Sequence, residues 1–195
     1  MIAMDFRGDM SVALRAVDRI TESIRDTATV RALNRAATTV RAEARKEIRA
    51  RYNLQAARVN KVIQIRQASR TNLQATVFAK DARLALALFG ARGFKRRGDV
   101  TVQVLRRGAR RVVKGNPNLP GKPFIATMKS GHVGIFQRTQ ASRPYSKPIM
   151  EELFSISIPG ALVNSSIGQT LQRVAKKRFN EEFRRELAFR RARGR

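Results

Sequence analysis

Few residues in this sequence could do acid–base or nucleophilic chemistry. The chain has one histidine, His132, and no cysteine, so it offers a single imidazole for proton transfer and no thiol for nucleophilic attack. The acids are scattered singly apart from two adjacent pairs, Glu151-Glu152 and Glu181-Glu182. Neighbouring side chains point about 100° apart on a helix and to opposite faces of a strand, so neither pair converges on one site. We expect His132 to be a surface or hydrogen-bonded turn residue, and we expect no enzyme activity.

Motifs for metals, nucleotides and membranes are missing as well. The sequence contains no H-x-x-x-H, D-x-D-x-D-G or C-x-x-C spacing and no glycine-rich phosphate loop. No run of apolar residues approaches the 18 or more that a membrane helix needs. We therefore expect no cofactor, no metal and no membrane partner.

The abundant chemistry is that of arginine. The chain has 41 Lys and Arg against 14 Asp and Glu, a formal charge of +27, and 31 of the cations are Arg. Arginine binds phosphate and carboxylate groups through two parallel hydrogen bonds. Self-repulsion on this scale opposes folding unless a partner compensates it. Leu, Ile, Val and Phe still make up about 26 % of residues, enough for a core.

Two groups of arginines are candidates for partner contacts. One group recurs every four residues along a predicted helix face, and the other lies in residues 90–115, where nine cations accompany one acid, Asp99. A solvated surface explains either group equally well. The candidates for contact with an acidic protein surface or DNA are Arg41, Arg45, Arg49, Arg96, Arg97, Arg106, Arg107, Arg110 and Arg111.

Helices are predicted for the N-terminal part. A first helix, capped by Asp9 or Ser11, would bury Met10, Leu14, Val17, Ile20 and Ile24. A second would bury Val30, Leu33, Ala37, Val40, Ala44 and Ile48. Thr27 or Thr29 could cap the second helix, although one long bent helix fits the same pattern. A short basic helix is predicted for residues 54–62.

Strands are predicted for the middle of the chain. Apolar residues alternate in residues 73–79 and 100–105, and the latter strand would return as residues 111–113 after a turn at 107–109. For residues 84–89 we favour a strand over a helix. Residues 115–121 hold two prolines and two glycines and predict a loop. A further hairpin would join residues 123–128 to 132–137 through Lys129-Ser130-Gly131.

The C-terminal part predicts one long helix. A strand-like run leads to Pro159 in a first helical turn, and an apolar ridge follows at Leu171, Val174 or Ala175, Phe179, Phe183 and Leu187. Acids on this helix would pair with its own arginines. The whole sequence predicts an α+β fold with N-terminal helices, a small antiparallel sheet of four to five strands and a long C-terminal helix. We expect one domain, 1–195, with a helical part at 1–63, the sheet at 73–158 and the last helix at 159–191.

Three segments, in this order, resemble the minor tail protein Z family of lambda-like phages, also called tail completion proteins. They are Ala32-Leu33-Asn34-Arg35-Ala36-Ala37 continuing through Arg51, the hairpin from Pro123-Phe124-Ile125 to Phe136-Gln137-Arg138, and residues 145–159 with Pro148-Ile149 and Ile158-Pro159. The similarity spans roughly residues 10–190, and chain length and basic charge agree with it.

The resemblance implies a structural virion protein without enzymatic activity. It implies a place at the head-proximal end of the tail, reached from the host cytoplasm during assembly, where the protein serves head–tail joining and DNA passage. It further implies a hexameric ring, with tail-tube, tail terminator and connector proteins as partners and genomic DNA in the lumen. The alternative that the charge leaves open is a nucleic-acid-binding architectural protein without sequence specificity.

Overall fold

Two compact units make up the structure, a computed structural model that describes residues 2–5, 22–80, 83–93, 99–139, 149–163 and 165–193. Unit 1 comprises the described residues of Met1–Ile48, Asn60–Lys80 and Pro159–Arg195. Unit 2 comprises those of Arg49–Val59 and Asp81–Ile158. The α+β fold class is confirmed, with a long helix towards each end of the sequence and small antiparallel sheets between them.

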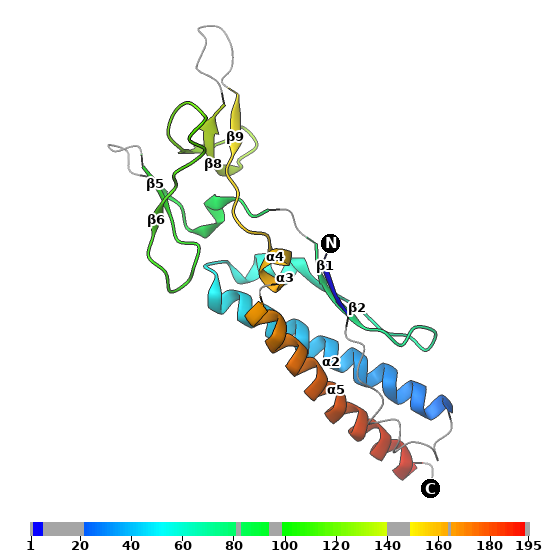
Figure 1. Cartoon of the computed structure of the whole chain (residues 1–195). Helices are drawn as coiled ribbons and strands as arrows, with labels where there is room; N and C mark the ends of the chain where they lie inside the picture. The colour runs from blue at the N-terminus through cyan, green and yellow to red at the C-terminus, as the bar shows by residue number, and fades with distance from the viewer. Residues whose placement is uncertain are drawn as a thin grey trace. The chain divides into compact units, whose positions relative to one another are not determined.

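Unit 1 is built on two long helices that lie side by side and antiparallel, α2 (Glu22–Arg51) and α5 (Ser165–Arg193) (Figure 1). The predicted ridge of α5 is confirmed, with Ala175 as its member where Val174 or Ala175 was predicted. All five residues of the ridge are at most 9 % exposed. On α2 the buried stripe is rich in small residues, including Ala28, Ala32 and Ala36. A short helix, α4 (Ile158–Val163), precedes α5 and holds Pro159 in its first turn, as predicted.

A three-stranded sheet packs on α2 within unit 1. Its order is β1 (Ile2–Asp5), β3 (Thr76–Ala79), β2 (Ile63–Arg66), and β2 follows directly on the short helix α3 (Ala56–Val62). The Asn34 side chain of α2 donates to the Ala68 carbonyl oxygen at 3.1 Å and accepts from the Ala68 amide at 2.7 Å. This pair of hydrogen bonds fixes the segment after β2 against α2.

Unit 2 contains two further sheets and a turn of 3-10 helix, η1 (Leu86–Phe89). The first sheet has the order β4 (Arg92–Gly93), β5 (Val100–Val102), β6 (Arg111–Val112). The second has the order β7 (Phe124–Thr127), β8 (Val133–Arg138), β9 (Met150–Glu152). Both predicted hairpins are confirmed, with Thr101 opposite Val112 in one and Phe124 opposite Phe136 in the other.

Several sequence predictions are corrected. Three sheets of three strands replace the single sheet of four to five, because β3 pairs with two segments that were not predicted as strands. β1 lies in the part predicted to be helical, and β2 begins where that part ends. The strand at residues 84–89 is wrong, since only Ala85 forms a bridge, with Phe154, before η1 turns Phe89 into the core. Neither Thr27 nor Thr29 starts a helix, because α2 runs through both. The predicted first helix cannot be compared over most of its length, because Met10, Leu14, Val17 and Ile20 lie outside the described residues.

Candidate functional site

Arg41 and Arg45 lie one turn apart on α2, and both reach the backbone around the end of α3. The Arg41 Nε donates to the Ile63 carbonyl oxygen at 2.9 Å, and an Arg45 Nη donates to the Asn60 carbonyl oxygen at 3.1 Å. The last carbonyl groups of a helix have no partner within the helix and carry a partial negative charge. The two arginines therefore cap α3 and hold it on α2.

Arg45 remains electrostatically unsatisfied in this arrangement. Its Nε is buried and has no hydrogen-bond partner among the described residues. Burial and, second, the positive charge of Arg41 lower the pKa of Arg45 from its usual value. An anionic group placed near this pair would relieve both effects.

Arg49 and Arg106 meet at the end of α2. The Arg106 amide donates to the Arg51 carbonyl oxygen at 2.9 Å, and its guanidinium donates to the Arg49 carbonyl oxygen at 3.0 Å. Arg106 thus caps α2 in the same way that Arg41 and Arg45 cap α3. The Arg49 side chain itself is exposed.

The basic hairpin of β5 and β6 divides its arginines between two roles. The Arg110 guanidinium donates to the carbonyl oxygens of Gly90 and Thr101, so it ties the hairpin to the end of η1. The side chains of Arg107 and Arg111 are exposed and have no hydrogen bond or ion pair with any other described residue. Arg96 and Arg97 lie outside the described residues.

Exposed apolar side chains accompany the free arginines of the hairpin. Leu105, just before the turn, is 47 % exposed, and Val112 on β6 is 52 % exposed. Arginine beside apolar groups is the composition that protein–protein interfaces favour. We call the exposed residues Leu105, Arg107, Arg111 and Val112 together the hairpin surface. Arg111 and Val112 are consecutive on β6, so their side chains point to opposite faces of that strand.

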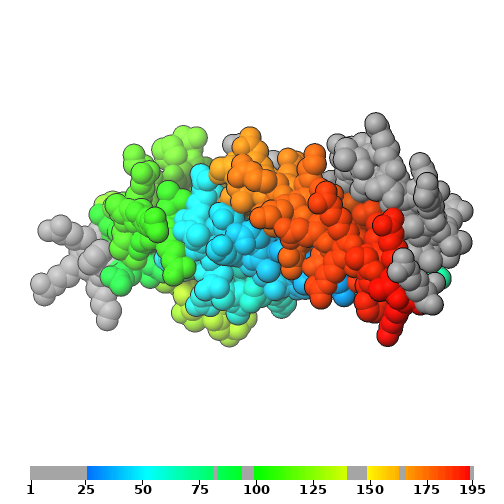
Figure 2. Space-filling view, turned by 90° about the horizontal axis from the view of Figure 1, so that it is seen from below, coloured from blue at the N-terminus to red at the C-terminus, as the bar shows by residue number. Residues whose placement is uncertain are grey.

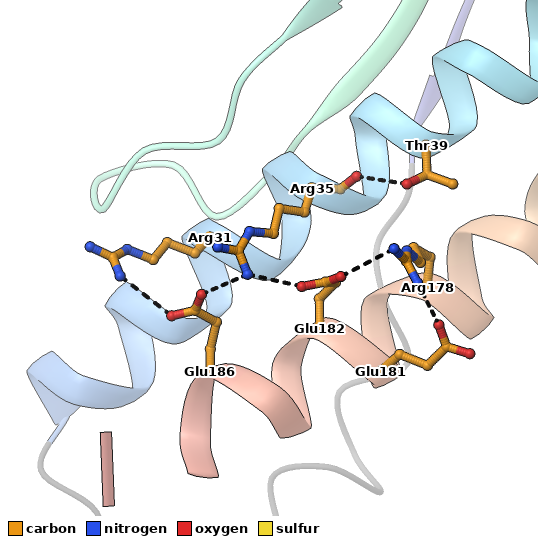
Figure 3. A network of polar contacts seen from close by, with 7 residues as sticks. All are labelled: Arg31, Arg35, Thr39, Arg178, Glu181, Glu182 and Glu186. Atoms are coloured by element: carbon orange, nitrogen blue, oxygen red, sulfur yellow. Dashed lines mark hydrogen bonds and ion pairs between the residues drawn. The ribbon is translucent and has the colours of Figure 1, made fainter. Parts of the chain in front are cut away.

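A charged cluster joins the two long helices (Figure 3). The predicted pairing of acids with arginines within α5 is confirmed for Arg178, but the sequence analysis missed the pairs with α2. An Arg35 Nη of α2 lies 3.0 Å from a Glu182 oxygen and 2.9 Å from a Glu186 oxygen of α5. Arg31 reaches Glu186 at 3.5 Å, and Arg178 reaches Glu182 at 3.4 Å. Both carboxylate side chains are only 6 % exposed, whereas the arginines are about half exposed.

A signal for this cluster was present in the sequence. Glu182 and Glu186 are spaced four apart and lie in phase with the apolar ridge of α5, so helical periodicity buries them. A shallow groove of about 360 Å³ opens beside the cluster. It is lined by Asn34, Arg35, Thr38, Thr39, Gln67, Arg178 and Glu182.

The one histidine makes a local contact. The His132 Nε2 lies 2.8 Å from a Glu152 carboxylate oxygen across β8 and β9, which confirms the expected hydrogen-bonded turn residue. Within the described part of the chain, no group of three or more His, Cys, Asp or Glu could hold a metal ion. The helices described there include none long and apolar enough for a membrane span.

Fold and surface together define a basic α+β protein whose arginines cap helices, bind buried acids and cover the exterior. The family of prophage minor tail protein Z matches residues 9–192 of the 195-residue chain, so the chain belongs to this family. It is a phage minor tail protein, and the resemblance drawn from the sequence is confirmed. No curated protein and no solved structure matches the chain.

Proposed function

We propose that this minor tail protein completes the tail at its head-proximal end, where it joins tail to head and lets DNA pass. The observation that carries the proposal is the hairpin surface, where Arg107 and Arg111 are exposed without a side-chain partner among the described residues and the apolar Leu105 and Val112 are exposed as well. Such a surface fits the acidic face of a connector, terminator or tail-tube subunit. The 195 residues would act there as one tail-completion domain.

A ring of six copies fits the same place. Each three-stranded sheet of unit 2 has two edge strands, and edge strands offer unpaired backbone groups to a neighbouring subunit. Six copies at +27 each would concentrate about +162 of formal charge. A charge of that size needs acidic neighbours or DNA close to the ring.

Charge reversal on the hairpin surface tests the proposal. Phage carrying Arg107→Glu with Arg111→Glu should make heads and tails that stay unjoined in electron micrographs, and its titre should fall by orders of magnitude. Arg106 and Arg110 are left unchanged because their guanidinium groups hold backbone carbonyls, and their loss would confuse folding with binding. Arg70→Glu with Arg83→Glu is the matched control, since both side chains are exposed and lie outside the hairpin. Normal titre from the hairpin variant would refute this assignment.

The alternative, an architectural nucleic-acid-binding protein, rests on the unpaired cations alone. The two functions can be distinguished by the protein composition of tails that assemble in cells making no heads. Such tails hold no genome, so finding the chain in them requires protein contacts and supports a tail-completion role. Finding it only with DNA would favour the alternative.

A further inference from the structure

The outward side of α5 carries a second basic surface, which neither the family nor the hairpin accounts for. Arg173, Lys177 and Arg184 follow one another at i, i+4 and i+11, so they point within about 40° of one another around the helix. All three are exposed, and none pairs with any other residue that the structure describes. We call these three residues the α5 outer stripe.

The acids of α5 compensate this stripe only in part, because Glu181, four residues after Lys177, is the one acid beside it. Glu182 and Glu186 point towards α2, where Arg31 and Arg35 bind them, and Glu181 pairs with Arg178 at 3.0 Å. The buried residues Leu171, Ala175 and Phe179 point at least about 120° away from the stripe. The three residues of the stripe are all cations, and Figure 2 shows much of α5, coloured orange to red, on the face in view.

The composition of the stripe separates it from the hairpin surface. Asn180 and Ala188 share its side of the helix, and no large apolar side chain does. The exposed Phe189 points away from the stripe. The centroid of its ring lies 4.8 Å from the Cζ of Arg193. A protein interface needs an apolar or aromatic core, and a single-strand site needs aromatic platforms. Contact with duplex phosphates needs only cations.

We propose that the α5 outer stripe binds the phosphate backbone of duplex DNA without reading its sequence. The stripe extends about 17 Å from Arg173 to Arg184, and duplex DNA presents a charge about every 1.7 Å, so every register offers phosphates. The choice of duplex DNA among polyphosphates rests on the proposed function, because a head-proximal tail protein meets the packaged genome. The stripe would guide this DNA while the hairpin surface holds protein.

Binding of scrambled duplex DNA to the purified full chain tests the proposal by fluorescence anisotropy at several salt concentrations. The stripe variant is Arg173→Gln, Lys177→Gln and Arg184→Gln, which keeps good helix formers on α5. Each lost phosphate contact removes about 0.9 from the salt slope, so the slope should fall by about 2.7 and the affinity at about 0.1 M salt by about 500-fold relative to that at about 1 M. Circular dichroism checks that the variant folds as the parent does.

A control variant with the same loss of charge makes the result specific. Arg107→Gln, Arg111→Gln and Lys114→Gln also lowers the formal charge by three, from exposed positions outside α5. It should keep most of the slope and affinity. Equal losses in both variants would mean that net charge alone binds DNA, and would overturn the stripe. Absence of binding by the parent chain at low salt would also overturn it and would leave an acidic protein as the occupant.

The outcome is independent of where the protein sits in the virion. If the stripe variant binds DNA normally while the chain is still found in head-free tails, the stripe proposal alone fails. If the chain is absent from such tails, the proposed function fails whatever the binding assay gives.

Discussion

Individual arginines in this protein have different structural roles, and their spacing in the sequence does not predict which arginine has which role. Arg41 and Arg106 donate to backbone carbonyls at helix ends, Arg35 bridges two buried carboxylates, and Arg107 faces solvent. A buried carboxylate is tolerated only when cations and hydrogen bonds replace its water. The pairing of Glu182 with Arg35 and Arg178 therefore stabilises the contact between α2 and α5.

The Glu182→Gln variant tests this role against a neighbour. Glu182 is buried between Arg35 and Arg178, so loss of its charge should lower the free energy of unfolding by about 1–3 kcal/mol. Glu181→Gln is the control, because Glu181 is 46 % exposed and pairs, among the described residues, with Arg178 alone, an arrangement worth about 0–1 kcal/mol. Urea unfolding measures both variants. Equal effects would show that burial of Glu182 adds nothing.

The loop at residues 115–121 is an element whose shape comes from one distant side chain. Gln137 of β8 is 2 % exposed, and its oxygen accepts from the Asn116 amide at 2.7 Å. Its nitrogen donates to the carbonyl oxygens of Asn116 and Gly121 at 2.9 and 3.1 Å. The backbone of an exposed loop is thus held by a buried amide, which lowers the entropy lost when a partner binds.

Alanine at two loop glycines separates backbone strain from loss of this clamp. Gly115 and Gly121 both have positive φ, +69° and +81°, so either alanine should cost about 1–2 kcal/mol. A Cβ at Gly115 would also lie 2.5 Å from the Gln137 oxygen, whereas at Gly121 it would meet nothing within 4 Å. Gly115→Ala should therefore lower the thermal midpoint clearly more than Gly121→Ala does. Equal midpoints would mean that Gln137 moves aside without cost.

Elements with a local signal were predictable, and those defined by distant partners were not. Periodicity gave α5 and both hairpins, and the Lys129-Ser130-Gly131 turn appears with Gly131 at φ +81°. β1 and β2 exist because each pairs with β3, many residues away in sequence. Their short runs carry no turn signal of their own.

The candidate site was predictable in composition but only partly in geometry. Exposure of Arg107 and Arg111 agrees with a surface role, and their partners stay a prediction. The i, i+4 spacing of Arg41 and Arg45 placed them on one helix face. It could not tell that this face meets carbonyl groups near Asn60 and Ile63, because tertiary packing brings those groups there.

At the scale of the whole molecule, charge sets the conditions under which the fold is stable. Long-range repulsion from a formal charge of +27 acts across the chain, whereas the attractive pairs in the described residues act over about 3–3.5 Å. Salt screens the long-range term more strongly than a short contact to a buried acid. Added salt should therefore weaken the long-range repulsion at lower concentrations than it weakens the ion pairs between α2 and α5.

Thermal unfolding at increasing salt tests this balance. Raising salt from about 0.01 M to about 0.1 M shortens the screening length from about 30 Å to about 10 Å, so the midpoint should rise. Inorganic polyphosphate at equal ionic strength should raise it further, because a ligand that binds the folded chain stabilises it by mass action. The stripe variant, with three fewer cations on α5, should respond less to both additions. A midpoint that falls with salt in the parent chain would mean that its ion pairs outweigh its repulsion, and that the fold needs no anionic partner to offset its charge.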